Sequence, residues 1–266
     1  MREDATSRQF AQYLNHLLGR AHNLLYMGTR PKVSGIVRFY RDAYPRIFRE
    51  TLPQTLLAMA IFFLAALVGS FVTFRDPGFA HRLLGPQMIE TIERHKMWTD
   101  SVVTLKPLAA SGIMTNNMSV AFAAFAFGIT AGIGTAWMLV LNGLLLGVIG
   151  MATWRSGMGY QFWSFVAPHG SLELPAIFLA AGAGLEVARG LLFPGLLPRR
   201  ESLAQAGGRA ARLVLGTIPL LFVAGIIEGF LSPSSVPAPL KLLVGGLLFS
   251  SLLLYLFSYA FPRRAS

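Results

Sequence analysis

The stretch Pro53–Phe74, "PQTLLAMAIFFLAALVGSFVTF", decides the fold class of this chain. It carries no charged residue over about the 20 residues that a helix needs to cross the hydrocarbon core of a bilayer. The chain of 266 residues is 54% hydrophobic and only 13% charged, and its mean hydropathy is +0.55. A soluble domain cannot bury that much apolar surface, so we predict an all-α polytopic membrane protein with this stretch as its first span.

The net charge of +11 bears on the partners of the chain. On an apolar chain, such an excess of positive charge sets the membrane topology and binds anionic lipid. No helix-turn-helix or zinc pattern points to nucleic acid. The chain has no cysteine, which excludes disulfides, thiol catalysis and cysteine-ligated metals. We expect no cleavable signal peptide, because the first apolar run starts only near Leu52.

The uncharged run 117–154 is longer than one span needs, and Gly132, Gly134 and Thr135 offer a break in it. Two spans here place the N-terminal segment, the arginine-rich loop 195–211 and the C-terminus on one side, and all three are basic, as cytoplasmic segments should be. We therefore predict one bundle with both termini in the cytoplasm and an extramembrane loop at 75–116 that contains an amphipathic helix near Pro86–Trp98. The predicted spans are about six: 54–74, 117–134, 136–154, 173–193, 212–231 and 240–261.

Residues 1–51, which precede the first span, are polar and basic. The stretch "YLNHLLGRAHNLLY" spaces its apolar residues as a helix does, and "IVRFYRDAYPRIFRE" mixes arginine with aromatic residues. This composition suits a helix at the lipid headgroups and equally a solvated pair of cytoplasmic helices. We accordingly divide the chain into a cytoplasmic amphipathic helical segment, 1–51, and a transmembrane bundle, 52–266.

Small residues spaced four apart predict close contacts between helices in the bundle. In lipid, such pairs let helix backbones approach closely. They leave open whether the chain forms a homo-oligomer. The pairs are Gly128 with Gly132, Gly143 with Gly147, and Ala180 with Gly184.

Polar residues interrupt the apolar runs, and a charge at the bilayer centre costs at least about 2.5–3.5 kcal/mol. His169 and Glu173 share one helix face, and we expect Pro168 to place them at the start of a helix at the outer interface. The predicted topology brings the outer ends of three spans together there, so the predicted polar cluster is Asn116, Asn117, His169, Glu173 and Glu228. Asn142 and Glu186 are the other polar interruptions.

Three interpretations of this predicted cluster remain open. It forms a hydrogen-bond network that locks the bundle, it lines a solute or proton pathway, or it holds a divalent metal through His169, Glu173 and Glu228. "HGSLE" does not match the H-E-x-x-H signature of zinc proteases, and the chain contains neither G-x-S-x-G nor a phosphate-binding loop. We therefore predict no catalytic residue, no bound metal and no cofactor.

Four blocks of the sequence, in the same order, resemble the stage II sporulation protein M family of integral membrane proteins. The first is "LNHLLGRAHNLLY", and the second is "NNMSVAFAAFAFGITAGIGTAWMLVLNGLLLG", with its paired Asn, Gly-Thr and Asn-Gly. The third, "PHGSLELPAIFLAAGAGLEVARGLLFPG", carries His-Gly-x-x-Glu-Leu-Pro-Ala, and the fourth is "AGIIEGFLSPSSVP". The family usually continues further upstream, so we expect either a shortened N-terminal region or a misassigned start.

The resemblance implies a bacterial inner-membrane protein that scaffolds other proteins and is not itself a hydrolase. In spore formers the namesake acts in engulfment of the forespore with peptidoglycan-degrading partners, and similar proteins occur in bacteria that never sporulate. We therefore expect a non-enzymatic protein that organises partners in remodelling of the cell envelope. The N-terminal segment and the 75–116 loop would be its docking surfaces, and a transporter or channel-like protein built on the polar cluster is the alternative.

Overall fold

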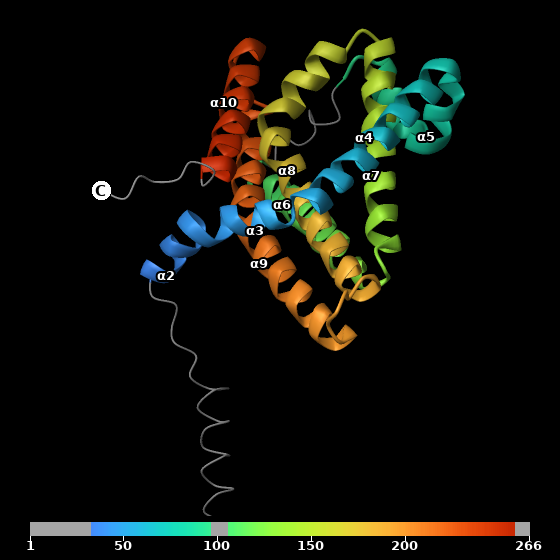
Figure 1. Cartoon of the computed structure of the whole chain (residues 1–266). Coiled ribbons are helices and arrows are strands. Elements are labelled where there is room, and N and C mark those ends of the chain that lie inside the picture. The colour runs from blue at the N-terminus through green and yellow to red at the C-terminus, as the bar shows by residue number, and fades with distance from the viewer. Residues whose placement is uncertain (1–32, 97–105, 259–266) are drawn as a thin grey trace, which may run out of the picture. The chain divides into compact units, whose positions relative to one another are not determined.

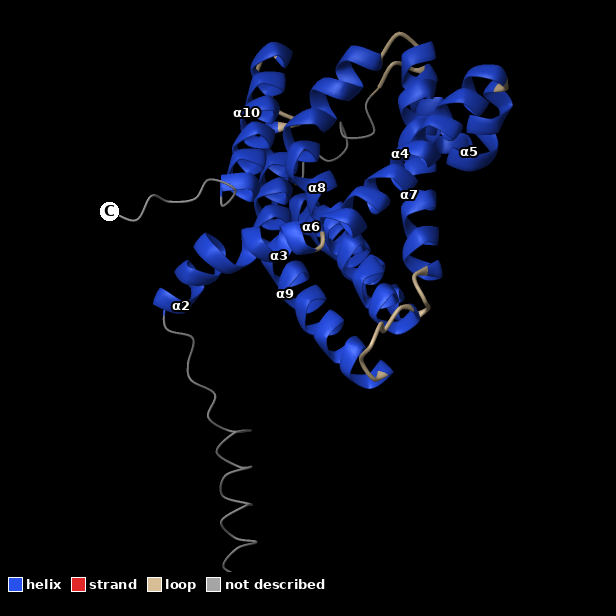
Figure 2. Cartoon of the chain, in the orientation of Figure 1, coloured by secondary structure: helices blue, strands red, loops and turns tan. Residues whose placement is uncertain are grey.

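The computed structural model describes residues 33–96 and 106–258. The helical stretch predicted near residues 13–26 and the basic C-terminal residues Arg263 and Arg264 lie outside this part of the chain. Within the described residues, Figure 2 shows helices joined by loops and no strand. The prediction of an all-helical chain is thus confirmed for the part that the structure describes.

The chain divides into two compact units, residues 1–41 and residues 42–266. The described part of the first unit holds α2, Val33–Arg38, which has no buried residue. A π-helical segment, Phe39–Ala43, contains the boundary between the units. The second unit contains all the helices considered below.

Among the described residues of the second unit, five helices are long and apolar enough to cross a bilayer. They are α4, α7, α8, α9 together with η5, and α10, so the predicted number of about six spans is approximate. The elements of the unit are α3 Tyr44–Glu50, α4 Leu52–Arg75, α5 Pro77–Glu93, α6 Lys106–Ala126, η4 Phe127–Ile129, α7 Ile133–Arg155, α8 Gly159–Leu192, α9 Arg199–Ile226, η5 Ile227–Leu231 and α10 Ala238–Phe257.

The run 117–154 is divided into two helices, as the charge bias favoured. α6 ends in the 3₁₀ turn η4, and α7 starts at Ile133 after Gly132, whose φ of 82° is readily adopted only by glycine. Thr130 closes the turn, because its hydroxyl accepts a hydrogen bond from the backbone N–H of Gly134 at 2.9 Å. The connection between the two helices is therefore a tight, glycine-dependent turn.

Three helices begin upstream of the spans predicted within them, because each helix extends beyond its apolar core. α8 begins at Gly159 and not near residue 173, α6 begins at Lys106 and not at Asn117, and α9 begins at Arg199 and not at 212. Residues 106–116 of the predicted 75–116 loop therefore belong to α6. A span is limited by bilayer thickness, but its helix continues wherever polar residues still form one.

Two prolines, Pro168 and Pro175, lie inside α8. Each lacks the backbone N–H that would bond to the preceding turn, and proline in a helix interior bends the helix. Figure 1 shows α8 changing direction partway along its length. Pro168 therefore lies inside a helix that has already started.

α8 is the central helix of the bundle and contacts α4, α6, α7, α9 and α10 (Figure 1). In the apolar window that could span the membrane, 72% of its residues are buried, against 22–44% for the other four spans. Residues 176–184 are buried without exception. A helix that is apolar all round is typical of such a core position, so α8 organises the packing of its neighbours.

α4 and α7 run parallel and pack with their backbones in close contact. A Cβ atom on Gly143 would overlap the carbonyl oxygen of Phe62, and one on Gly147 would overlap that of Ala66. Ser70 on α4 donates a hydrogen bond to the carbonyl of Gly147 at 3.0 Å. The absence of side chains at these two glycines therefore permits the contact.

A second glycine contact joins the α6–α7 turn to α8. A Cβ on Gly128 would overlap the backbone of Gly184, and Gly132 faces the side chain of Ala188. The predicted small-residue positions thus lie at helix contacts of the bundle, between α4 and α7 and between η4 and α8.

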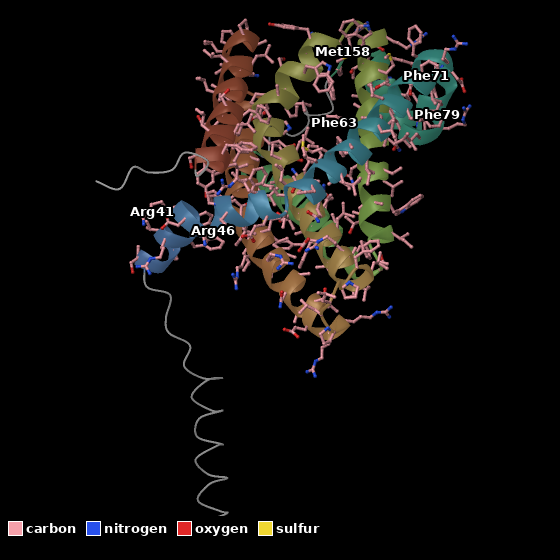
Figure 3. The ribbon with its side chains drawn as sticks, viewed as in Figure 1. Arg41, Arg46, Phe63, Phe71, Phe79 and Met158 are labelled. Carbon is pink, nitrogen blue, oxygen red and sulfur yellow. The ribbon has the colours of Figure 1, made fainter. Side chains whose placement is uncertain are left out.

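α5, which follows the first span, packs on α4 and α7 through its apolar face. Ala80, Ile89 and Ile92 form a buried cluster with residues of α7 and the loop after it. In Figure 3, the labelled side chains of Phe71 on α4 and Phe79 on α5 lie on this side of the bundle. The amphipathic helix predicted near Pro86–Trp98 is thus part of a longer helix, which Gly85 interrupts with a φ of 78°.

We predict that Gly147→Ala lowers the free energy of unfolding by about 1–3 kcal/mol, because the added methyl overfills the α4–α7 contact. Thermal or denaturant unfolding of the protein in detergent or nanodiscs measures this loss. Gly246→Ala on α10 is the matched control, since no atom lies within 4 Å of a Cβ built there. Equal stability of the two variants would show that the α4–α7 contact tolerates a side chain.

We predict that α5 loses helix at its start as the pH falls below about 4. Asp76 caps this helix, and the hydrogen bond from the Arg82 guanidinium holds the pKa of its carboxyl below the usual value of about 3.9. A lowered pKa contributes stability that is present above the unfolded-state pKa and lost as the pH falls through the folded-state pKa. Hydrogen exchange of residues 77–84 against pH measures it, and Asp76→Asn should remove the pH dependence.

Candidate functional site

The structure brings four of the predicted site residues together, and we call Asn117, His169, Glu173 and Glu228 the polar cluster. Asn117 comes from α6, His169 and Glu173 come from α8, and Glu228 comes from η5. The amide of Asn117 donates a hydrogen bond to Oε2 of Glu228 at 3.2 Å. Nε2 of His169 lies 3.9 Å from Oε1 of Glu228, and one ligand atom from each of His169, Glu173 and Glu228 lies within 4.8 Å of the others.

The remaining predicted polar residues stand outside this cluster or at its edge. Asn116 is exposed and donates a 3.4 Å hydrogen bond to the side chain of Asn117. Asn142 donates to the carbonyl of Met138 in its own helix, so it is satisfied within α7. The cluster therefore joins three elements through one Asn, one His and two Glu.

Two residues beside the cluster were not anticipated from the sequence. Ser232, which is buried, places its hydroxyl 2.9 Å from Nδ1 of His169. Lys241, also buried, donates from Nζ to the carbonyls of Ser232 and Ser234 at 2.7 and 2.8 Å. The available signals were a serine one turn after Glu228 and a single lysine in the apolar run that forms α10.

A cavity of about 190 Å³ lies against the polar cluster. His169, Glu173 and Glu228 reach its wall, and the rest of the lining is apolar or glycine, from α7, α8 and their neighbours. His169 is 6% exposed, and the Glu228 side chain is 13% exposed. The ionisable groups therefore face a small pocket lined mostly by apolar residues, where an uncompensated charge is costly.

The position of the cluster along its helices differs from the prediction. His169 and Glu173 lie in the interior of α8, well after Gly159, so no free backbone N–H groups of a helix start favour the Glu173 carboxylate. The predicted helix N-terminus there is wrong, because α8 starts at Gly159 and continues through Pro168. Glu228 lies in a π-helical segment, a local geometry that is frequent at functional sites.

The opposite end of α8 holds a second charged group. The buried carboxylate of Glu186 accepts hydrogen bonds from Arg189 at 2.7 and 2.8 Å and from Arg209 on α9 at 2.7 and 2.9 Å. Glu186 is 1% exposed, whereas both arginine side chains reach the surface. The sequence singled out Glu186 but not its partners, which compensate its charge and join α8 to α9.

The two charged sites are separated by an apolar length of α8. From Leu174 to Leu185 the helix carries only apolar residues and glycine, and most of them are buried. α8 itself therefore provides no polar side chain that would connect the polar cluster to Glu186.

We predict that the double variant Arg189→Met, Arg209→Met loses about 3–5 kcal/mol of unfolding free energy, because it leaves the Glu186 carboxylate buried without a partner. Adding Glu186→Gln should restore most of this loss by removing the buried charge. Chemical unfolding of the three variants measures the coupling. Arg94→Met, which opens an exposed ion pair with Glu90, is the control and should change stability little.

Comparison with known proteins identifies the family of the chain. The family model described as Stage II sporulation protein M matches residues 58–233, which include every residue of the polar cluster. The uncharacterised protein MJ0793 of Methanocaldococcus jannaschii is 29% identical over 123 residues, which cover 46% of this chain and 69% of that protein. No solved structure matches the chain. With the match extending over more than half of its residues, this chain belongs to the stage II sporulation protein M family of membrane proteins.

Proposed function

We propose that this protein is a non-enzymatic scaffold of the cytoplasmic membrane, which positions partner proteins that remodel the cell envelope. The observation that carries the proposal is α5, a helix that packs on the bundle through its apolar face and presents a charged face outward. The membership of the chain in the stage II sporulation protein M family supports a role in the membrane.

The two faces of α5 differ in the way that a docking surface requires. Ala80, Ile89 and Ile92 are buried against the bundle. The outer face carries both signs of charge, including an ion pair of 2.6 Å between Asp76 and Arg82 and a contact of 4.0 Å between His81 and Glu93. Mixed charges on a fixed surface favour selection of a polar partner by electrostatic complementarity, so we assign the docking of an envelope protein to this face.

The charge distribution supports an orientation for the scaffold. The start of α9 carries Arg199, Arg200, Arg209 and Arg212, and basic segments near membrane spans favour the cytoplasm. α5 and the polar cluster then lie toward the outer side, and both termini lie in the cytoplasm. The partners in this proposal are the bilayer and envelope proteins, and a second copy of the chain is one candidate among them.

A transporter is the second candidate, and the cavity beside the polar cluster favours it. The apolar length of α8 between Glu173 and Glu186 argues against a continuous polar route along this helix. The scaffold therefore explains more of the described bundle than a transport pathway does.

Site-specific photo-crosslinking in native membranes tests the scaffold. A photoreactive amino acid at the exposed Gln87 on α5 should give a reproducible adduct with an envelope protein, and the same group at Phe71 on the apolar face of α4 should not. Charge reversal at Arg82 and Arg94 should remove the adduct while the protein stays folded. Adducts with lipid alone from Gln87, together with proton or solute flux in proteoliposomes, would replace the scaffold by the transporter.

A further inference from the structure

The polar cluster offers ligand atoms that the described residues leave incompletely used. Among the side chains that the structure describes, in residues 33–96 and 115–258, none forms a hydrogen bond or ion pair with the Glu173 carboxylate. Nε2 of His169 lies 3.9 Å from Oε1 of Glu228, which is too long for a direct hydrogen bond. One imidazole nitrogen and two carboxylates thus lie close together without a direct hydrogen bond between them.

Neighbouring groups orient two of these three ligands. Ser232 lies 2.9 Å from Nδ1 of His169, and when Nδ1 donates to this hydroxyl, the lone pair is on Nε2, which faces the carboxylates. Asn117 donates to Oε2 of Glu228, which leaves Oε1 facing His169. Outer hydrogen bonds of this kind fix the tautomer and direction of metal ligands in proteins.

The spacing and the space suit an ion. Ligands of a tetrahedral ion with bonds of about 2.0–2.1 Å lie about 3.3 Å apart, so the ligand atoms, 3.9 Å apart for His169 and Glu228 and within 4.8 Å for all three, must move closer by about 0.6–1.5 Å when they bind an ion. The three groups line a cavity of about 190 Å³, and a water molecule in liquid takes up about 30 Å³. Water can therefore complete the coordination of an ion beside the protein ligands.

The charges of the cluster also call for a cation. Two carboxylates in an apolar surrounding repel each other and lose hydration, and a divalent ion compensates both. Lys241 is the buried cation beside the cluster, but its hydrogen bonds go to the carbonyls of Ser232 and Ser234. Its contacts stabilise the loop after η5, and the carboxylates are left for another positive charge.

We propose that His169, Glu173 and Glu228 bind one divalent transition-metal ion and thereby link α8 to η5. One imidazole and two carboxylates are ligands that suit Zn²⁺ and Mn²⁺. This site goes beyond the scaffold proposed above and does not depend on it. The ion joins the interior of the central helix, next to Pro168, to η5, which follows α9.

Metal analysis of the full chain tests the site. Tag-free protein in lipid nanodiscs is stripped with EDTA, dialysed against low micromolar Zn²⁺ or Mn²⁺, and measured by inductively coupled plasma mass spectrometry. We expect about one ion per chain and a higher Tm with the ion than without it. Folded wild-type protein that retains neither ion, and whose Tm neither ion raises, would refute the site regardless of any variant.

Variants locate the ion in the cluster. Glu173→Gln and Glu228→Gln should abolish stoichiometric binding and the rise in Tm, whereas Glu201→Gln on the exposed start of α9 should leave both unchanged. Ser232→Ala keeps all three ligands and should weaken metal affinity by about 10–100-fold. Undiminished binding by both cluster variants would place the ion elsewhere. Loss of the α5 adducts with metal binding intact would refute only the scaffold.

Discussion

In a bilayer, helices gain little from hiding apolar surface against one another, because lipid is as apolar as they are. The bundle therefore depends on close backbone contact and on polar links, and α8 supplies both. Its neighbour η4 meets it at Gly128 and Gly184, while Glu186 and His169 connect it to α9 and to the segment after it. The outer helices can then leave their other faces to lipid, as the 64% exposed Phe71 of α4 illustrates.

The apolar runs of the sequence were sufficient to locate the bundle but not the ends of its helices. The charge-free stretch at 53–74 became α4 almost without change, and the basic segments correctly favoured a break near Gly132. The starts of α6, α8 and α9 lie outside the predicted spans, because hydropathy identifies only the part of a helix that fits the hydrocarbon core. Helix formation continues past that limit, and Pro168 is tolerated inside α8 where neighbouring helices surround the bend.

The residues of the candidate site could be predicted as far as the order and direction of the helices could be predicted. Placing three helix ends on one side was enough to bring Asn117, His169 and Glu228 to the same region, although their depth along the helices was wrong. Ser232 and Lys241 were missed because their contacts depend on how the loop 232–237 folds over η5. The spacing of apolar residues in the sequence does not reveal how such a loop folds. A lysine near a helix start has many ordinary roles.

The parallel arrangement of α4 and α7 also governs how the chain assembles during synthesis. Parallel neighbours cannot be joined by a short hairpin, so the chain must pass through α5 and α6 before Gly143 and Gly147 reach the backbone of α4. Until then, α4 waits in the membrane without its main partner. The buried carboxylate of Glu186 on α8 must likewise enter before its partner Arg209 is synthesised. During biogenesis, the early helices of this protein therefore remain without their partners until the later helices are made.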